Sequence, residues 1–210
     1  MAASPDSALE REIIAREAEL LGKPQRIEPL KPEEFDEQAV EMVMGLRASL
    51  GINAMDEIPQ VFGVMLKHPG LFRCQMETGI EMLGKGTLNK RERELAILRV
   101  GWLCRAPFEW GQHVAIAKRY GIEAEAIERV TQGPSAEGWT EHEHAVISAV
   151  DELLDDQMIS DETWEVLARS WGERQFLEFP MVVGQYFMTA LQQNSLRIRL
   201  QDGNIGLRQR

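Results

Sequence analysis

Two acids and one histidine are spaced so that they could move protons. Glu109 and His113 lie four residues apart, and a second acid, Glu94, precedes Glu109 by fifteen residues. Side chains four residues apart on a helix share one face. A carboxylate beside an imidazole can transfer a proton near neutral pH, because an unperturbed histidine titrates at ~6.5. If Glu94 folds onto the same spot, apolar surroundings would separate the pKa values of the three groups and assign acid and base roles.

The composition excludes several other functions. The chain has 210 residues, 44% of them hydrophobic, and one large domain that needs no disulfides is expected. Its net charge of −11 argues against a nucleic-acid partner, because phosphate binding needs a basic face. Cys74 and Cys104 form no CxxC pair, so neither a redox dithiol nor a zinc knuckle is predicted. No apolar run approaches the ~20 residues of a membrane span and no signal peptide is visible, so a cytoplasmic protein without a membrane partner is expected.

Nearly every segment reads as a helix, which predicts an all-α fold. Capping and breaking residues divide the chain, and the break at Arg105–Pro107 is the clearest, because a proline suits the first turn of a new helix. The predicted helices span residues 4–21, 32–50, 58–66, 71–83, 90–104, 107–120, 123–131, 145–154, 160–168 and 175–193. A capping box at residues 140–143 precedes the helix over 145–154.

This pattern predicts three parts of the chain. Residues 1–31 form a first helix and a proline-containing linker, residues 32–196 form a helical domain, and residues 197–210 form a C-terminal tail. The tail carries four arginines and two glycines. Two interpretations of it stay open, a loose end or an arm that lies across a neighbouring subunit.

The segments Leu88–Arg99, Glu109–Ala117 and Tyr120–Ile122 resemble the carboxymuconolactone decarboxylase family, whose superfamily also holds the alkylhydroperoxidase D proteins. The resemblance is strongest over 88–133, looser over 35–87 and 140–193, and absent from the first helix. It implies an alkylhydroperoxidase D-like helical bundle in which a helical hairpin carries the site. It also implies a homo-oligomer such as a trimer or hexamer, and a sedimentation mass equal to one chain would contradict this.

The resemblance further distinguishes two chemistries. The peroxidase branch of the superfamily carries two cysteines on the second hairpin helix, close to three and seven residues before the histidine. Here Glu109 and Ala106 stand four and seven residues before His113, and Cys104 has no partner at disulfide spacing. A peroxidase needs one thiol to attack the peroxide and another to resolve the product. Peroxidase activity is therefore not expected, and the departure favours the decarboxylase branch, in which a Glu–His pair handles protons on a lactone acid.

Roles follow from the chemistry of such a substrate. Loss of carbon dioxide beside a butenolide leaves an enolate that must be stabilised and then protonated on carbon. We expect His113 to transfer the proton, Glu109 to set its tautomer or shuttle the proton, and Glu94 to hold the imidazole or act as the second acid. The residues predicted to bind the substrate are Arg93, which could instead brace the hairpin, Arg99, Arg105 and Trp110. The expected partner is a small organic acid or lactone, and no cofactor or metal is expected.

Two functions of other classes stay open. One is a thiol-dependent peroxidase that uses Cys104 with or without Cys74, and the other is a non-catalytic small-molecule-binding oligomer built on the same scaffold. Hydration, isomerisation and lactone opening are neighbouring reactions that also stay open, because a fold alone does not determine which reaction is catalysed. His142 and His144 are two residues apart and diverge on a helix, so a metal site there is not favoured.

Overall fold

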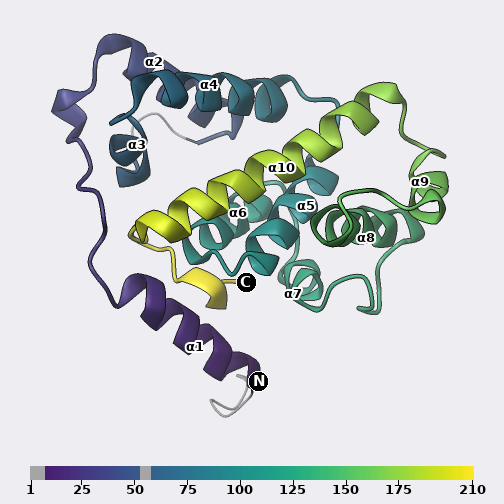
Figure 1. The fold of residues 1–210 in the computed structure, drawn as a ribbon. Helices are drawn as coiled ribbons and strands as arrows, with labels where there is room; N and C mark the ends of the chain where they lie inside the picture. The colour runs from purple at the N-terminus through teal and green to yellow at the C-terminus, as the bar shows by residue number, and fades with distance from the viewer. Residues whose placement is uncertain (1–7, 53–57) are drawn as a thin grey trace.

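A computed structural model describes residues 8–52 and 58–210, and the regular elements within these ranges are helices, without a strand. The all-α prediction is therefore confirmed (Figure 1). None of the described helices is long and apolar enough to cross a lipid bilayer. The elements, in chain order, are α1 (Ala8–Leu21), η1 (Pro32–Glu34), α2 (Glu37–Ser49), α3 (Gln60–Met65), α4 (Pro69–Ile80), η2 (Glu81–Lys85), α5 (Lys90–Leu103), α6 (Pro107–Arg119), α7 (Ala124–Gln132), α8 (Glu141–Asp155), α9 (Asp161–Leu167), α10 (Glu173–Leu196) and η3 (Gly206–Arg208).

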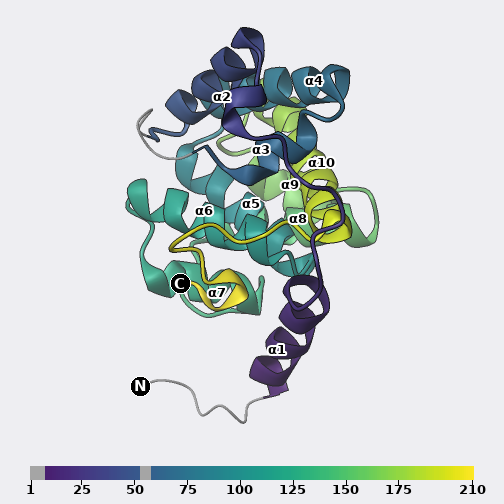
Figure 2. The ribbon, with the colours of Figure 1, turned by 90° about the vertical axis from the view of Figure 1, so that its left-hand side faces the viewer.

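Helix α5 is the centre of the molecule. It packs against α6, α7, α8 and α10, and every side chain from Arg93 to Val100 is buried. A helix covered on all sides carries apolar residues around its whole circumference, as Leu95, Ala96 and Ile97 illustrate. Figures 1 and 2 show α2, α3 and α4 on one side of this centre and α7, α8 and α9 on the other, with α10 crossing between them. A polar side chain between Arg93 and Val100 is thus held away from water.

The turn between α5 and α6 forms the predicted hairpin. Asn89 caps α5, because its side chain accepts a hydrogen bond of 2.8 Å from the backbone N–H of Arg91. The helix ends at Cys104, and Arg105 follows in the left-handed region with a φ of 47°. Pro107 then occupies the first turn of α6, as its sequence position predicts. The reversal brings α6 back along α5, so side chains of both helices can meet.

Several predicted boundaries differ from the structure, and for two of them the physical reason is clear. The helix expected to start at Pro32 is divided, because the Asp36 carboxylate accepts a 2.7 Å hydrogen bond from the N–H of Ala39 and so starts α2 afresh. The helix expected to close at Gly84 instead continues as the π-helical turn η2. The carbonyl of Leu83 in that turn accepts a hydrogen bond from Arg93, so the widened turn has a buried partner on α5. The predicted start at Ser4-Pro5 lies outside the described residues.

The C-terminal tail is packed on its own chain and is not a loose end. Leu207 is 2% exposed and joins the core cluster that contains Trp110. The indole N–H of Trp110 donates to the carbonyl of Gln209 at 2.9 Å. Arg208 forms ion pairs of 2.9 and 2.7 Å with two acids of α1, Glu10 and Glu17. The tail therefore joins α1 to α6, the helix that carries Glu109 and His113.

The crossing of the tail over α6 requires a glycine. A Cβ on Gly111 would overlap the side chain of Asn204, which is itself held: its amide donates to the carbonyl of Phe108 at 3.1 Å and its oxygen accepts from the N–H of Gly206 at 2.8 Å. We expect Gly111→Ala to lower the free energy of unfolding by ~1–3 kcal/mol through overpacking. Urea denaturation measures this change.

Gly184 offers a matched control for that substitution. It also lies inside a helix, α10, but a Cβ there meets nothing within 4 Å. Gly184→Ala should therefore raise the free energy of unfolding by ~0.5–1 kcal/mol, because it removes conformational freedom from the unfolded chain. If both variants shift stability in the same direction, the tail does not press on α6 as described.

Candidate active site

The structure brings the three predicted catalytic side chains together. His113 on α6 lies between two carboxylates, with its Nδ1 2.8 Å from Glu94 Oε2 and its Nε2 3.3 Å from Glu109 Oε1. Glu94 is fully buried, and Glu109 and His113 are 4% and 5% exposed. The hairpin explains this convergence, because α5 supplies one acid while the i,i+4 pair on α6 supplies the other acid and the imidazole.

This geometry favours the imidazolium form of His113. Both ring nitrogens face a carboxylate, and only the doubly protonated ring can donate a hydrogen bond to each. Burial by itself would lower the pKa of His113, but the charge of Glu94 and the hydrogen bonds to Glu109 and Glu94 outweigh burial and raise this pKa to about 9. At neutral pH the ring therefore holds a proton that it can give to a substrate.

Two further side chains hold the acids from behind. Arg93 donates to Glu94 Oε1 from Nε and Nη2, both at 3.4 Å, and its Nη1 donates to the carbonyl of Leu83 at 3.0 Å. Gln193 of α10 donates from its amide to Glu109 Oε2. Counted in their charged forms, Arg93, His113, Glu94 and Glu109 sum to zero. Such pairing is what makes four buried ionisable groups tolerable.

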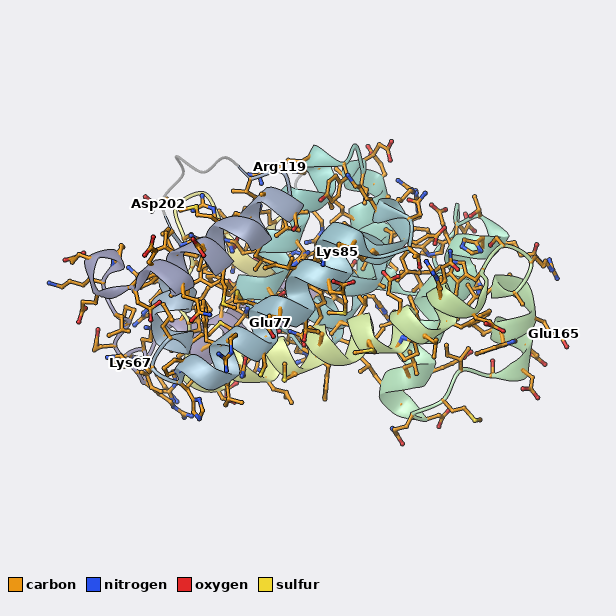
Figure 3. The ribbon with its side chains drawn as sticks, turned by 90° about the horizontal axis from the view of Figure 1, so that it is seen from above. Lys67, Glu77, Lys85, Arg119, Glu165 and Asp202 are labelled. Atoms are coloured by element: carbon orange, nitrogen blue, oxygen red, sulfur yellow. The ribbon has the colours of Figure 1, made fainter. Side chains whose placement is uncertain are left out.

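Glu109 and His113 line a cavity in the described part of the chain, whereas Glu94 lies behind them and does not. The cavity has a volume of about 530 Å³ and lies between α2, α3, α4, α6, α10 and the tail. Its far wall is apolar and is formed by α2, α3 and α4, through Leu46, Leu50, Val61, Phe62, Met65 and Met76. Arg119 and Asp202 also line it, and Figure 3 shows both at one edge of the molecule. A small, mostly apolar molecule could therefore reach the Glu–His pair.

The four residues predicted to bind the substrate do not line this cavity. Arg93 braces Glu94, as described above. Arg99 forms hydrogen bonds of 2.6 and 2.8 Å with Asp151 of α8, and Arg105 is exposed and pairs with Glu12 at 3.2 Å. Trp110 is fully buried and bonds the tail. Their polar atoms are used elsewhere, so the geometry gives no support to their predicted role.

Other polar side chains line the cavity instead, and the sequence reasoning missed them. They are Arg47, Gln75, Gln112, Arg119, Gln185, Tyr186, Thr189 and Gln193 on the helices, and Gln201, Asp202, Asn204 and Gln209 in the tail. Arg47 had a usable signal: it lies four residues after Val43 and three before Leu50, so a charged residue shares the apolar face of a predicted helix. Tyr186 had none, because it fits the apolar pattern of α10 as an ordinary core residue.

Cys104 is poorly suited to peroxide chemistry. Both cysteines are free, with Cys74 exposed on α4 and Cys104 half-buried at the end of α5. Burial, together with the charge of Glu109, raises the pKa of the Cys104 thiol to about 11. A thiol must ionise to attack a peroxide, so Cys104 is a weak nucleophile at neutral pH.

His142 belongs to a separate polar cluster. Its Nε2 lies 3.1 Å from Glu92 Oε1 on α5, and its Nδ1 lies 3.2 Å from Ser170 Oγ. The Trp171 indole donates to the other oxygen of Glu92 at 3.0 Å. These contacts tie α8 and the start of α10 to α5. Among the residues that the structure describes, no group of three His, Cys, Asp or Glu side chains is arranged to hold a metal ion.

The raised pKa of His113 predicts how stability depends on pH. Below pH ~6.5 the folded and the unfolded chain both hold this proton, and between there and about 9 only the folded chain does. The free energy of unfolding should therefore fall as the pH rises through this window, by up to ~1.4 kcal/mol per pH unit. Urea denaturation at intervals from pH 6 to 9 measures the slope. His113→Gln, which cannot titrate, should flatten it, and an unchanged slope in that variant would contradict the assignment.

The fold and the buried Glu–His–Glu arrangement define a helical protein with an acid–imidazole cluster on a hairpin. Residues 69–152, which include all three side chains of the cluster, match the model of the carboxymuconolactone decarboxylase family, the family that the sequence resembles. No curated protein sequence matches the chain.

Solved structures extend the comparison to most of the fold. One is the alkylhydroperoxidase D core of an uncharacterized peroxidase-related protein from Ralstonia eutropha, which is 15% identical in sequence and has a TM-score of 0.71. The match covers 86% of this chain and 94% of that protein's chain. A peroxidase-related protein from Silicibacter sp. is 14% identical with a TM-score of 0.70, covering 87% and 94%. A cysteine-to-alanine variant of the debrominase Bmp8 in complex with 2,3,4-tribromopyrrole is also 14% identical with a TM-score of 0.70, covering 84% and 91%. Identities this low establish a shared alkylhydroperoxidase D-like fold and no shared reaction.

Proposed function

We propose that this protein is a general acid/base enzyme that acts without a cofactor on a small carboxylated lactone or a related organic acid, and that the reaction is decarboxylation. One observation carries the proposal: an imidazole with two carboxylate partners lines a cavity of about 530 Å³ through His113 and Glu109. Glu94 holds this imidazole from behind and is itself held by Arg93. Titratable groups with perturbed pKa values in a pocket are typical of active sites.

The steps follow from the charges. The bond between the substrate carboxylate and its ring carbon breaks, carbon dioxide leaves, and the electron pair moves onto the lactone carbonyl oxygen as an enolate. His113 then gives a proton to a ring carbon, directly or through Glu109 Oε1, and the enolate collapses to the neutral product. The imidazole of His113 then regains its proton from water. Because His113 is an imidazolium at neutral pH, the proton is in place before the substrate binds.

The cavity fits such a substrate in size and polarity. An anion is repelled by a net charge of −11, so local positive charge is needed for it to bind. Arg47 and Arg119 line the cavity and supply that charge, while α2, α3 and α4 supply an apolar wall for a ring. We therefore propose these two arginines, in place of Arg99 and Arg105, as the residues that attract the substrate carboxylate.

Carbon dioxide release tests the proposal. The purified protein is incubated with carboxymuconolactone and with a panel of other carboxylated butenolides, and carbon dioxide is measured beside a heat-inactivated sample. Release from at least one of them is expected. A ligand-dependent rise in melting temperature without release from any of them would favour the non-catalytic binding protein, because a ligand at 100 times its Kd stabilises the folded state by ~2.7 kcal/mol.

A thiol-dependent peroxidase is the second candidate, favoured by the peroxidase-related names of two structural neighbours. The half-buried Cys104, whose thiol pKa is raised, argues against it. Thiol titration after treatment with an organic hydroperoxide separates the two functions. Loss of both thiols together with catalytic consumption of the hydroperoxide would support the peroxidase.

The exposed face of α10 supports the proposed homo-oligomer. Leu177, Met181, Met188 and Leu191 are 73%, 60%, 40% and 50% exposed, and their spacing of four, seven and three residues places them on one side of the helix. An apolar stripe of this kind typically marks a protein contact. We propose that a second copy of the chain covers it.

A further inference from the structure

Tyr186 lies beside the reacting pair, although nothing in the proton-transfer steps uses it. It projects from α10 into the cavity wall, and its ring meets the ring of His113 edge to face, with the centroids 4.8 Å apart and the planes at 85°. The residue is 7% exposed. Gln193 lies seven residues further along the same face of α10 and holds Glu109. The helix that positions one catalytic acid therefore also positions Tyr186.

The hydroxyl of Tyr186 is available to a ligand. No residue that the structure describes forms a hydrogen bond with this hydroxyl, and the hydroxyl is not closed off from solvent. The hydroxyl of Tyr120 also lacks a hydrogen-bond partner, but it is buried away from solvent, and Tyr120 does not line the cavity. A buried tyrosine usually finds a hydrogen-bond partner for its hydroxyl. The open hydroxyl of Tyr186 points to a partner supplied by the substrate.

The surroundings keep this hydroxyl protonated. Burial, followed by the negative charges of Glu109 and Glu94, raises the pKa of Tyr186 well above its ordinary value. The group can therefore donate a hydrogen bond but cannot act as a base near neutral pH. A neutral donor in a pocket of low dielectric stabilises an oxyanion without first losing a hydration shell.

We infer that Tyr186 is a further catalytic residue, whose hydroxyl donates a hydrogen bond to the substrate oxygen that becomes negative when carbon dioxide leaves. The inference rests on the proposed function and adds to it the group that receives the enolate. The hydroxyl bond of Tyr186 stays intact throughout, and the only proton transferred is the one from His113 to carbon. The substrate class narrows accordingly to acids whose carboxyl group sits on a saturated ring carbon, from which the electron pair released with carbon dioxide can move through the ring to a carbonyl oxygen within reach of Tyr186.

Tyr186→Phe tests this role, and Tyr120→Phe is the matched control. Both remove one phenolic oxygen near the same charges, since the Tyr120 ring lies 5.9 Å from the Arg93 guanidinium, but only Tyr186 lines the cavity. In the carbon dioxide assay, Tyr186→Phe should lower kcat by about 10²–10³-fold and leave KM within a few-fold. Tyr120→Phe should stay within threefold of the wild type. Thermal melting shows that each variant is folded.

A binding experiment keeps the inference separate from the decarboxylase proposal. The probe is 4-nitrophenolate, an aromatic oxyanion whose absorbance reports binding at pH 8. Wild type and Tyr120→Phe should bind it equally, and Tyr186→Phe should bind it at least tenfold more weakly. His113→Gln separates the proton step from binding. The single variant should abolish turnover. The double variant His113→Gln/Tyr186→Phe should still bind the probe more weakly than His113→Gln does.

Three results would overturn the inference. They are a kcat of Tyr186→Phe within threefold of the wild type, equal affinities of Tyr186→Phe and Tyr120→Phe for the probe, and failure of the wild type to bind the probe. If no carboxylated lactone releases carbon dioxide, the proposed function fails, and the affinities for 4-nitrophenolate decide the role of Tyr186 on their own.

Discussion

Replacement of His113 with alanine is expected to lower the release of carbon dioxide from a carboxylated lactone by about 10²–10⁴-fold, the range that a positioned proton-transfer group contributes. The variant removes the proton donor and leaves Glu94 and Glu109 facing each other across the space that the ring had filled. Both kcat and kcat/KM should fall together, because the proton is needed only in the transition state.

His142→Ala is the control for this experiment. His142 also lies beside a glutamate, with 3.1 Å between its Nε2 and Glu92 Oε1, but neither residue lines the cavity. Its removal should leave kcat within about threefold of the wild type. Unchanged turnover in His113→Ala, for a substrate that the wild type consumes, would remove His113 from the mechanism and take the central argument for an enzyme with it.

Replacement of Glu94 with glutamine should give the largest loss of stability in this chain. Glu94 is fully buried and balances the charges of Arg93 and His113, so the variant strands positive charge in the core. Removal of one partner from a buried ion pair destabilises a protein by ~3–5 kcal/mol. For a chain of this length, each kcal/mol lowers the melting temperature by ~2–4 °C. Urea denaturation at pH 7 and thermal melting measure both effects.

Glu81→Gln provides the comparison. Glu81 pairs with Lys85 at 2.7 Å, but both side chains are about two-thirds exposed, at 66% and 67%. Exposed pairs of this kind contribute ~0–1 kcal/mol because water and salt screen them. If Glu94→Gln were no more destabilised than Glu81→Gln, Glu94 would not be the counter-charge that the structure indicates. Its loss should also shift the pH-dependent decline of stability to lower pH, because Glu94 is the main group that raises the pKa of His113.

The helices and the acid–imidazole cluster were predictable because local rules decide them. Asn89 and Pro107 set the ends of the hairpin helices, and the four-residue spacing of Glu109 and His113 fixes their shared face. The cavity was not predictable in the same way. It is closed by α2, α3, α4 and the tail, which reach α6 only through tertiary packing. The division of the chain at residues 32 and 196 remains a prediction.

The predicted substrate arginines show how nearness in sequence misleads. Arg99 follows Glu94 by five residues, which is about 140° around a helix of 3.6 residues per turn, so it points toward α8 and meets Asp151. Arg47 is more than forty residues from Glu94 in sequence and yet lines the cavity. In this chain, the place of Arg47 on an apolar helix face, and not nearness to the motif, indicates an arginine that lines the cavity.

The ion pairs between α1 and the tail join segments that are far apart in the sequence. The partners of the α1 acids Glu10 and Glu17 include Arg208, nearly two hundred residues later. The same tail supplies residues 201–204 to the wall of the cavity. Contacts between residues so far apart form more slowly in refolding than local ones, because a long loop must close first. In refolding from urea, the cavity wall should therefore form after the local turn between α5 and α6.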